Sequence, residues 1–198
     1  LTVGRHALEA HETRRRGKVH TGSMEATAQA GRPPRGAPPV RILEGQAGSQ
    51  AAANAMRAYR AELGERLAGD PSLSHAEDAE VTPPNGDFCI VSEVATGETI
   101  GFGAVHVVEP GVVEIKRMWL RPDVRGRGLG KFLLKHLENR ARALGGRRVI
   151  LGVNAELVEA CGLYRASGYE PVERFEDNPH ITHFFGKQLV RDEPTRST

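Results

Sequence analysis

The chain has 198 residues, of which 39% are hydrophobic, so it is long enough for one domain with a substantial core. It has no apolar run as long as a membrane-spanning helix, and Cys89 and Cys161 are far apart, outside any metal or redox spacing. The formal net charge of +2 does not indicate a nucleic-acid binder, and two cysteines predicted to be buried thiols fit a reducing, cytoplasmic location.

The positive charge is concentrated at the N-terminus. Residues 1–39 contain seven Lys or Arg against three Asp or Glu, whereas residues 40–198 contain 20 against 22. The first segment has no apolar periodicity and ends in a Pro-, Gly- and Arg-rich run, so it is predicted to be a disordered tail. Its basic run at 14–18 could contact RNA or acidic lipid, but a solvated tail is the commoner state. The sequence leaves open whether the native protein starts at Met24, which would place residues 1–23 outside it.

Hydrophobic periodicity predicts one folded domain over residues 40–190, followed by a flexible end at 191–198. A short strand at 40–43 precedes a helix in which the apolar residues from Ala52 to Leu67 recur every three or four positions. A polar, acidic loop follows this helix. The remaining elements are predicted in chain order as strands 88–94, 99–108 and 112–120, helix 129–144, strand 149–153, helix 157–166, and strands 170–174 and 182–189.

The most informative stretch is Arg125-Gly126-Arg127-Gly128-Leu129-Gly130, between the strand at 112–120 and the next helix. A helix N-terminus has unpartnered N–H groups and a partial positive charge, and glycines let an anion approach because they have no Cβ atom. A Walker A loop would need Ser or Thr in place of Phe132, and a dinucleotide fingerprint would need its third glycine one residue later. The remaining pattern, Arg/Gln-x-x-Gly-x-Gly/Ala, is matched without a gap; a turn that binds no ligand is the alternative.

The matched pattern resembles motif A of the GNAT superfamily, whose members are acetyl-CoA-dependent N-acetyltransferases. The segment at 162–170, with Tyr164 followed by Gly168-Tyr169, resembles motif B of that family, and the segment at 114–122 resembles its fourth strand. The resemblance covers roughly residues 40–189 and is to compact bacterial members of unassigned substrate. It implies an α/β fold, the GNAT fold, in which a central mixed, mostly antiparallel sheet carries helices on both faces.

The resemblance also implies that acetyl-CoA is the cosubstrate and that its acetyl group passes to a primary amine by direct attack in a ternary complex. Residues 125–131 would hold the pyrophosphate, the backbone N–H of Met118 would stabilise the oxyanion, and Leu120 would contact the pantetheine arm. Asn154 would either bind pantetheine or order a strand end. The residues so assigned to cofactor binding are Met118, Leu120, Arg125, Gly126, Arg127, Gly128, Leu129, Gly130, Lys131 and Asn154, with Arg165 and Ser167 near the 3′-phosphate.

A lysine-like amine has a pKa of about 10.4, so only about 1 in 2,500 molecules is unprotonated at pH 7, and a general base is useful. Glu114 is the candidate, because it precedes Met118 by four residues, as the catalytic Glu does in the histone-acetylating members that this strand resembles. Alternation along the strand would place Glu114 on the same face as Met118 and Leu120, unless a bulge intervenes. The equally weighted alternative is a structural Glu that pairs with Lys116 or Arg117.

Tyr164, in the segment that resembles motif B, is the candidate general acid. Its phenol can donate a hydrogen bond to the departing thiolate sulfur without carrying a charge. The alternative is a core tyrosine that packs its helix against the sheet.

The acceptor side is the least determined by the sequence. In the implied fold, the first helix, the loop after it and the last hairpin build this side, and Tyr59 and Arg60 are the candidate substrate residues. Arg60 could bind the carboxylate of an amino-acid-like acceptor, whereas acidic loops would suit a cationic amine; both options stay open. The loops carry His75, Glu77, Asp78, Glu80, Glu176, Asp177 and His180, in no spacing typical of a metal site.

Two further hypotheses differ from an enzyme. A non-catalytic acyl-CoA-binding sensor would keep the glycine-rich turn but would not need Glu114 or Tyr164. A nucleic-acid-associated protein would act through the basic tail, which the slightly acidic folded part does not favour. The expected partner is therefore a small-molecule or peptide amine, with no membrane, and a homodimer like those common in the family remains an option.

Overall fold

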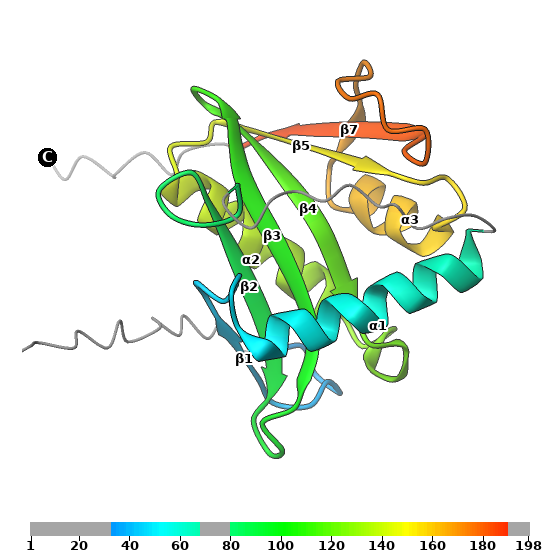
Figure 1. Ribbon diagram of the computed structural model, residues 1–198. Coiled ribbons are helices and arrows are strands. Elements are labelled where there is room, and N and C mark those ends of the chain that lie inside the picture. The colour runs from blue at the N-terminus through cyan, green and yellow to red at the C-terminus, as the bar shows by residue number, and fades with distance from the viewer. Residues whose placement is uncertain (1–32, 68–79, 190–198) are drawn as a thin grey trace, which may run out of the picture.

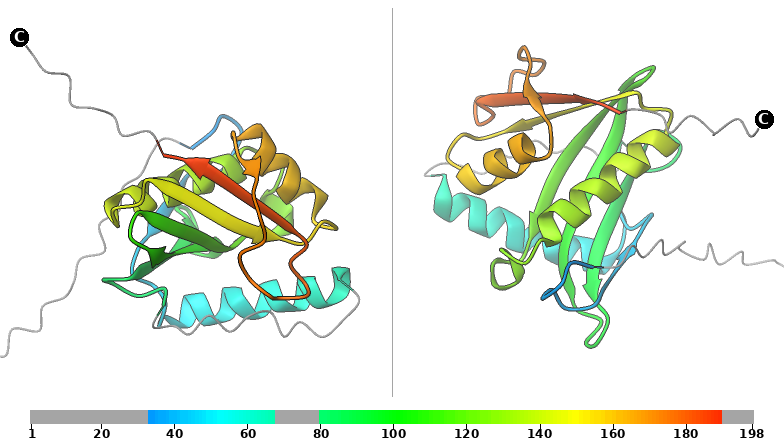
Figure 2. Two further views of the ribbon diagram at one scale, coloured as in Figure 1. Left: turned by 90° about the horizontal axis from the view of Figure 1, so that it is seen from above. Right: turned by 180° about the vertical axis from the view of Figure 1, so that it is seen from behind.

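The computed structural model describes residues 33–67 and 80–189. A seven-stranded sheet, in the order β1-β2-β3-β4-β5-β7-β6, carries helix α1 on one face and helices α2 and α3 on the other (Figures 1 and 2). This mixed, mostly antiparallel sheet with helices on both faces confirms the predicted fold class. The elements are β1 Val40–Leu43, α1 Gln50–Arg66, β2 Gly86–Glu93, β3 Thr99–Glu109, β4 Val112–Leu120, the short 3₁₀ helix η1 Pro122–Val124, α2 Leu129–Ala143, β5 Arg148–Val153, α3 Val158–Ala166, β6 Glu170–Pro171 and β7 His183–Gln188.

The predicted elements are all confirmed, and the largest difference in length is at β6. Strand β6 has only two residues and lies at the edge of the sheet, where Pro171 is tolerated because an edge strand pairs on one side only. The predicted tail, apart from 33–39, and the predicted flexible end lie outside the described residues. Met24, His75, Glu77 and Asp78 also lie outside them. None of the helices in the described segments is long and apolar enough to cross a membrane.

Two apolar clusters fasten the helices to the sheet. The larger cluster lies against α2 and α3 and contains buried residues such as Leu133 and Leu137. The smaller cluster lies against α1 and contains Ala52 and Phe102. The hydroxyl of Ser49 caps α1 by accepting a hydrogen bond of 3.0 Å from the N–H of Ala52. The two clusters therefore fix α1 on one face of the sheet and the N-terminus of α2 at the other.

Strands β4 and β5 are parallel, but they pair only at one end. Their register joins Val112 to Arg148 and ends where Glu114 meets Ile150. Beyond this point the two strands diverge, as Figure 1 shows. The sheet therefore has a wedge-shaped opening, and Glu114 stands at its apex.

A bulge in β4 changes which side chains share a face. Ala104 pairs with Lys116, but Phe102, two residues earlier, pairs with Trp119, so β4 has one residue more than β3 in this stretch. Arg117 lies in the bulge with a φ of 55°. The expectation that Glu114 and Leu120 share a face is therefore wrong. The side chains of Glu114, Lys116 and Trp119 lie on the α1 side, and Leu120 packs in the larger cluster on the other side.

Candidate active site

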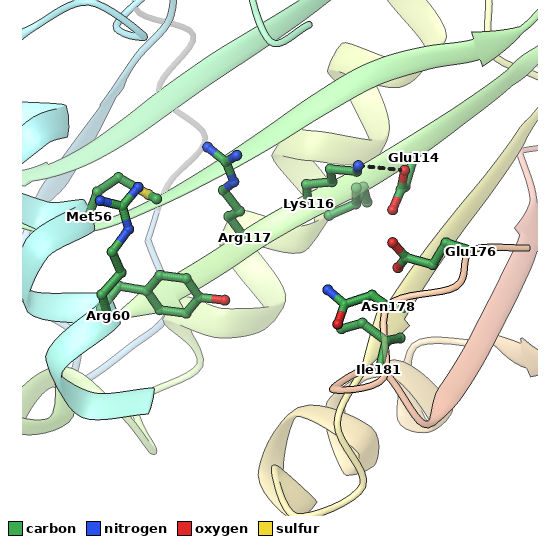
Figure 3. A pocket seen from close by; sticks show the side chains of 11 residues that line it. Met56, Arg60, Glu114, Lys116, Arg117, Glu176, Asn178 and Ile181 are labelled. Carbon is green, nitrogen blue, oxygen red and sulfur yellow. Dashed lines mark ion pairs between the residues drawn. The ribbon is translucent and has the colours of Figure 1, made fainter. Parts of the chain in front are cut away.

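Two cavities lie on either side of the β4 bulge. The first, which we call the glycine-loop groove, has a volume of about 340 Å³ and runs between α1, the end of β4, the turn at 125–130 and α3. The second, which we call the charged pocket, has a volume of about 80 Å³ and lies between α1, β4, β5 and the loop before β7 (Figure 3). Tyr59 lines both cavities, so the two meet at this side chain.

The glycine-rich turn brings a helix N-terminus to the groove. Gly126 and Gly128 have φ values of 73° and 80°, in the left-handed region that side chains with a Cβ atom rarely adopt. The first helical bond of α2 runs from the N–H of Phe132 to the carbonyl of Gly128 at 3.1 Å. The N–H groups of Leu129, Gly130 and Lys131 thus precede the helical ladder, and no acidic residue occupies this first turn. The turn can therefore bind an anionic group such as a phosphate.

Arg125 lines the groove beside the glycine-rich turn, and its guanidinium is held by a carboxylate of α1. Its guanidinium donates two hydrogen bonds to the carboxylate of Glu62 on α1, at 2.8 and 2.6 Å, and a third to the carbonyl of Leu120 at 2.7 Å. The Trp119 indole also donates to Glu62, at 2.8 Å. Burial raises the pKa of Glu62, but the hydrogen bonds from Arg125 and Trp119 outweigh it and hold the pKa below its ordinary value. Arg125 therefore braces the turn against α1.

The other residues assigned to the cofactor fall into two groups. Met118, Leu120, Gly126, Gly128, Gly130 and Lys131 line the groove, and Met118 has no partner in the β3–β4 register, which skips from Lys116 to Trp119. Arg127 is exposed beside this turn.

The second group lies away from the groove walls. Asn154 donates to the carbonyl of His180 and accepts from the N–H of Glu156, both at 2.9 Å, so it orders the end of β5. The guanidinium of Arg165 lies 5.3 Å from the centre of the Phe185 ring. The Ser167 hydroxyl is buried at the end of α3.

Tyr164 is buried in the larger cluster. Its ring centre lies 5.8 Å from that of Tyr169 and 6.2 Å from that of Phe185. Burial raises the pKa of the Tyr164 phenol far above its ordinary value, and the nearby Tyr59 and Cys161 raise it further. The phenol is therefore protonated at any physiological pH, and Tyr164 is not among the residues that line the two cavities.

Glu114 lies in the charged pocket with only 6% of its surface exposed. Its Oε2 atom lies 2.7 Å from Nε2 of His106 and 3.3 Å from Nζ of Lys116. The second oxygen is on the side of Glu176 (Figure 3). The ion pair with Lys116 that the sequence allowed is thus present, and the same carboxylate is also available to the pocket. His106, which the sequence analysis missed, is the residue opposite Glu114 in the β3–β4 register.

A second carboxylate enters the pocket from the loop before β7. A Cβ atom placed on Gly152 of β5 would lie 2.8 Å from Oε1 of Glu176, so this carboxylate occupies the opening between β4 and β5. Burial raises the pKa of Glu176, and the charge of Glu114 raises it further, while Lys116 opposes the shift. Glu176 is one of the seven loop residues that the sequence offers for the acceptor side, and no sequence feature distinguishes it from the others.

Cations and a neutral amide complete the pocket. Arg60 and Arg117 lie on the side of α1, opposite Glu176 and Asn178 (Figure 3). The pocket can therefore hold a ligand that carries a positive charge, with room for a negative charge at its other end. In residues 33–67 and 80–189, no group of three or more His, Cys, Asp and Glu side chains is arranged to hold a metal ion.

Comparison with known proteins gives one family. A sequence model described as the acetyltransferase (GNAT) family matches residues 51–169. An uncharacterized N-acetyltransferase of Schizosaccharomyces pombe is 34% identical over 98 residues, which are 49% of this chain and 60% of the relative. The uncharacterized N-acetyltransferase YjgM of Escherichia coli is 30% identical over 107 residues, 52% of this chain and 62% of the relative. The match thus spans less than two thirds of either relative.

The fold also resembles solved structures. The structure of a GNAT family acetyltransferase from Elizabethkingia anophelis with acetyl-CoA bound has a TM-score of 0.55 and 17% sequence identity, and the match covers 76% of this chain and 98% of that one. At this identity the likeness establishes the architecture. The role of each side chain has to come from the geometry of the two cavities.

Proposed function

This chain belongs to the GNAT acetyltransferase family, and on that premise we propose that it transfers the acetyl group of acetyl-CoA to a primary amine by direct attack in a ternary complex. The observation that carries the proposal is the meeting of two different cavities at Tyr59. One of them ends in a turn suited to a phosphate, and the other contains carboxylates that would attract an ammonium group. The names of the relatives and the acetyl-CoA in the Elizabethkingia structure support the assignment.

The glycine-loop groove suits acetyl-CoA. The first-turn N–H groups at 129–131, together with Lys131 and the exposed Arg127, would bind the pyrophosphate, and Leu120 would contact the pantetheine arm. The N–H of Met118 is the proposed oxyanion donor, since Met118 has no partner in the strand register and lines the groove. For Asn154, Arg165 and Ser167, a role in binding acetyl-CoA is supported by the motif resemblance alone.

The charged pocket would receive the amine. Glu114 is the proposed general base, because its buried carboxylate lines this pocket at the apex of the strand opening. Lys116 and His106 contact one oxygen of this carboxylate, which leaves the other to accept a proton from the ammonium. Tyr59 and Arg60 line the wall provided by α1, where they would contact the body of the acceptor.

Tyr164 is the proposed general acid. Its high pKa keeps the proton on the phenol until a strong base such as the departing thiolate draws on it. A buried phenol can donate this hydrogen bond without the desolvation cost of a charged acid. The influence of Tyr59, where the two cavities meet, on the pKa of Tyr164 supports this role.

The test is the release of CoA thiol from acetyl-CoA with a panel of polyamines, amino acids, aminoglycosides, lysine peptides and N-terminal peptides. We expect one acceptor class to give turnover, and Tyr164→Phe to lower kcat at least about 100-fold with it. Tyr169→Phe is the matched control, since it removes a hydroxyl from the neighbouring buried ring and should leave kcat unchanged. Tight acetyl-CoA binding without thiol release for any amine would contradict the enzyme and favour the acyl-CoA sensor.

A further inference from the structure

His106 connects the charged pocket to a third cavity. The imidazole lies across the β3–β4 ladder from Glu114, with its Nε2 atom 2.7 Å from Oε2 of the carboxylate. Glu114 lines the charged pocket, and His106 lines a separate surface cavity of about 410 Å³ together with Glu80 and Asn85. One hydrogen bond therefore joins a group inside the proposed acceptor site to a group that faces solvent.

The proposed reaction requires a route for one proton. An ammonium and acetyl-CoA give an amide, a free thiol and one proton, so the ammonium loses two protons in all. One of these balances the thiol through the acid, and the other has to leave the site. A buried carboxylate that kept this proton would be neutral at the start of the next turnover and could not act as a base again.

We propose that His106 carries this proton out of the acceptor site, an inference that rests on the proposed function. Glu114 takes the proton on its free oxygen as the N–H bond of the acceptor breaks. Rotation of the neutral carboxyl group about its Cγ–Cδ bond then turns the O–H toward His106, and Nε2 accepts the proton. The imidazolium then rotates so that Nε2–H faces the surface cavity, releases this proton to water and rotates back. Nδ1 keeps its own proton throughout, so Nε2 can again accept a proton from Glu114. No oxidant or other reactant is needed.

The groups around His106 favour this direction. Glu114 on β4, Glu80 at the surface cavity and Glu176 in the loop before β7 are carboxylates that attract the transient positive charge. Lys116 on β4 opposes it, but its ammonium can only donate, so it cannot take the proton from Glu114. The side chain of His106 is also more exposed than that of Glu114, 14% against 7%, so it is the more solvent-accessible member of the pair.

The decisive experiment is chemical rescue of His106→Gln. We expect kcat near pH 7 to fall at least about 10-fold, with the KM for acetyl-CoA unchanged, and added imidazole to restore most of the loss by entering the surface cavity. The loss should shrink as the pH rises, because hydroxide then takes the proton directly. His183→Gln on β7 is the matched control, and imidazole should not change its rate.

The outcomes separate this inference from the proposed function. A His106→Gln protein that melts like the wild type and either keeps full kcat or loses activity that imidazole does not restore would overturn the relay alone. If His106→Gln does not fold, His106→Asn takes its place with the same rescue. Wild-type protein that releases no thiol with any amine would overturn the function and, with it, the relay.

Discussion

The glycine-loop groove and the charged pocket meet at Tyr59, yet they are built in different ways. Helices α1 and α3 form two walls of the groove, but its anion-binding end depends on backbone geometry within a short stretch, from Met118 to Lys131, where a strand end, a left-handed turn and a helix N-terminus follow one another. The charged pocket depends on side chains from segments that lie far apart in sequence, from Arg60 to Asn178. A backbone anion site can therefore be predicted from a local pattern, whereas a side-chain pocket needs the register of the sheet.

The pocket is the place where substitution should have its largest effect. Glu114→Gln keeps the size of the side chain but removes the proposed base, so kcat/KM for the amine should fall at least about 100-fold near pH 7. The loss should be greatest at low pH and diminish as free amine becomes abundant. Steady-state rates measured from pH 6 to pH 10 would show this.

Because the groove and the pocket are built separately, Glu114→Gln should affect the amine site and spare the acetyl-CoA site. The KM for acetyl-CoA should change little in Glu114→Gln, because the carboxylate lines the charged pocket. Glu98→Gln is the control, since Glu98 is an exposed carboxylate that pairs with Arg121. A pH–rate profile identical to that of the wild type would refute the role of Glu114.

Acetyl-CoA binding in the groove should weaken when the backbone of the glycine-rich turn is disturbed. Gly128→Val would place a β-branched side chain at a φ of 80°, and its Cβ atom would lie 2.9 Å from Cγ of Pro34. We expect the turn to shift and at least one N–H bond to the pyrophosphate to be lost. A bond to a charged group contributes about 2 kcal/mol, which corresponds to a rise of about 30-fold in the KM for acetyl-CoA.

Gly162→Ala is the matched control for this change. Gly162 lies within α3, and a Cβ atom there would meet no other atom within 4 Å. The substitution should stabilise the helix by about 1 kcal/mol and leave both KM values unchanged. An acetyl-CoA affinity that survives Gly128→Val, measured by calorimetry, would show that this turn does not hold the cofactor.

The sequence predicted features that depend on local patterns, and it did not predict features that depend on contacts between distant segments. Strands β1 and β4 have the predicted bounds because apolar runs flanked by turn residues are local signals, and the glycine spacing identified the turn. The bulge at Arg117 has no such signal, so the faces of Glu114 and Leu120 were predicted wrongly. Partners across the sheet are not local either. For this reason the contact of His106 with Glu114 was missed.

Arg125 shows a limit of motif matching itself. The pattern places a basic residue at the start of the turn, but it does not say which anion the side chain will meet. Here the carboxylate of Glu62 accepts hydrogen bonds from both terminal nitrogens of the guanidinium. Glu62 lies on α1, whose position depends on the packing of the sheet. A bidentate partner at this distance cannot be predicted from the spacing around Gly128.

The smallest predicted effect tests whether the pocket carboxylates interact. In the folded protein the pKa of Glu176 is raised by burial and then by the charge of Glu114, so the fold favours its protonated form. This contribution to stability is complete below the ordinary Glu pKa of about 4.3 and is lost as the pH rises through the raised value. Glu176→Gln removes the cost of ionisation, so its Tm should exceed that of the wild type by roughly 1–2 °C at pH 7 and match it at pH 4.

The acceptor kinetics should distinguish a charge effect from a packing effect. Glu176→Gln should raise the KM for the amine several-fold, because one of the two carboxylates that attract the ammonium is gone, and leave the KM for acetyl-CoA unchanged. Glu173→Gln, an exposed change in the same loop, should alter neither value. If Glu176→Gln raised the Tm equally at pH 4 and pH 7, the gain would come from side-chain packing and not from removing the charge of Glu176. The repulsion between the two carboxylates, and with it their shared role in the pocket, would then be absent.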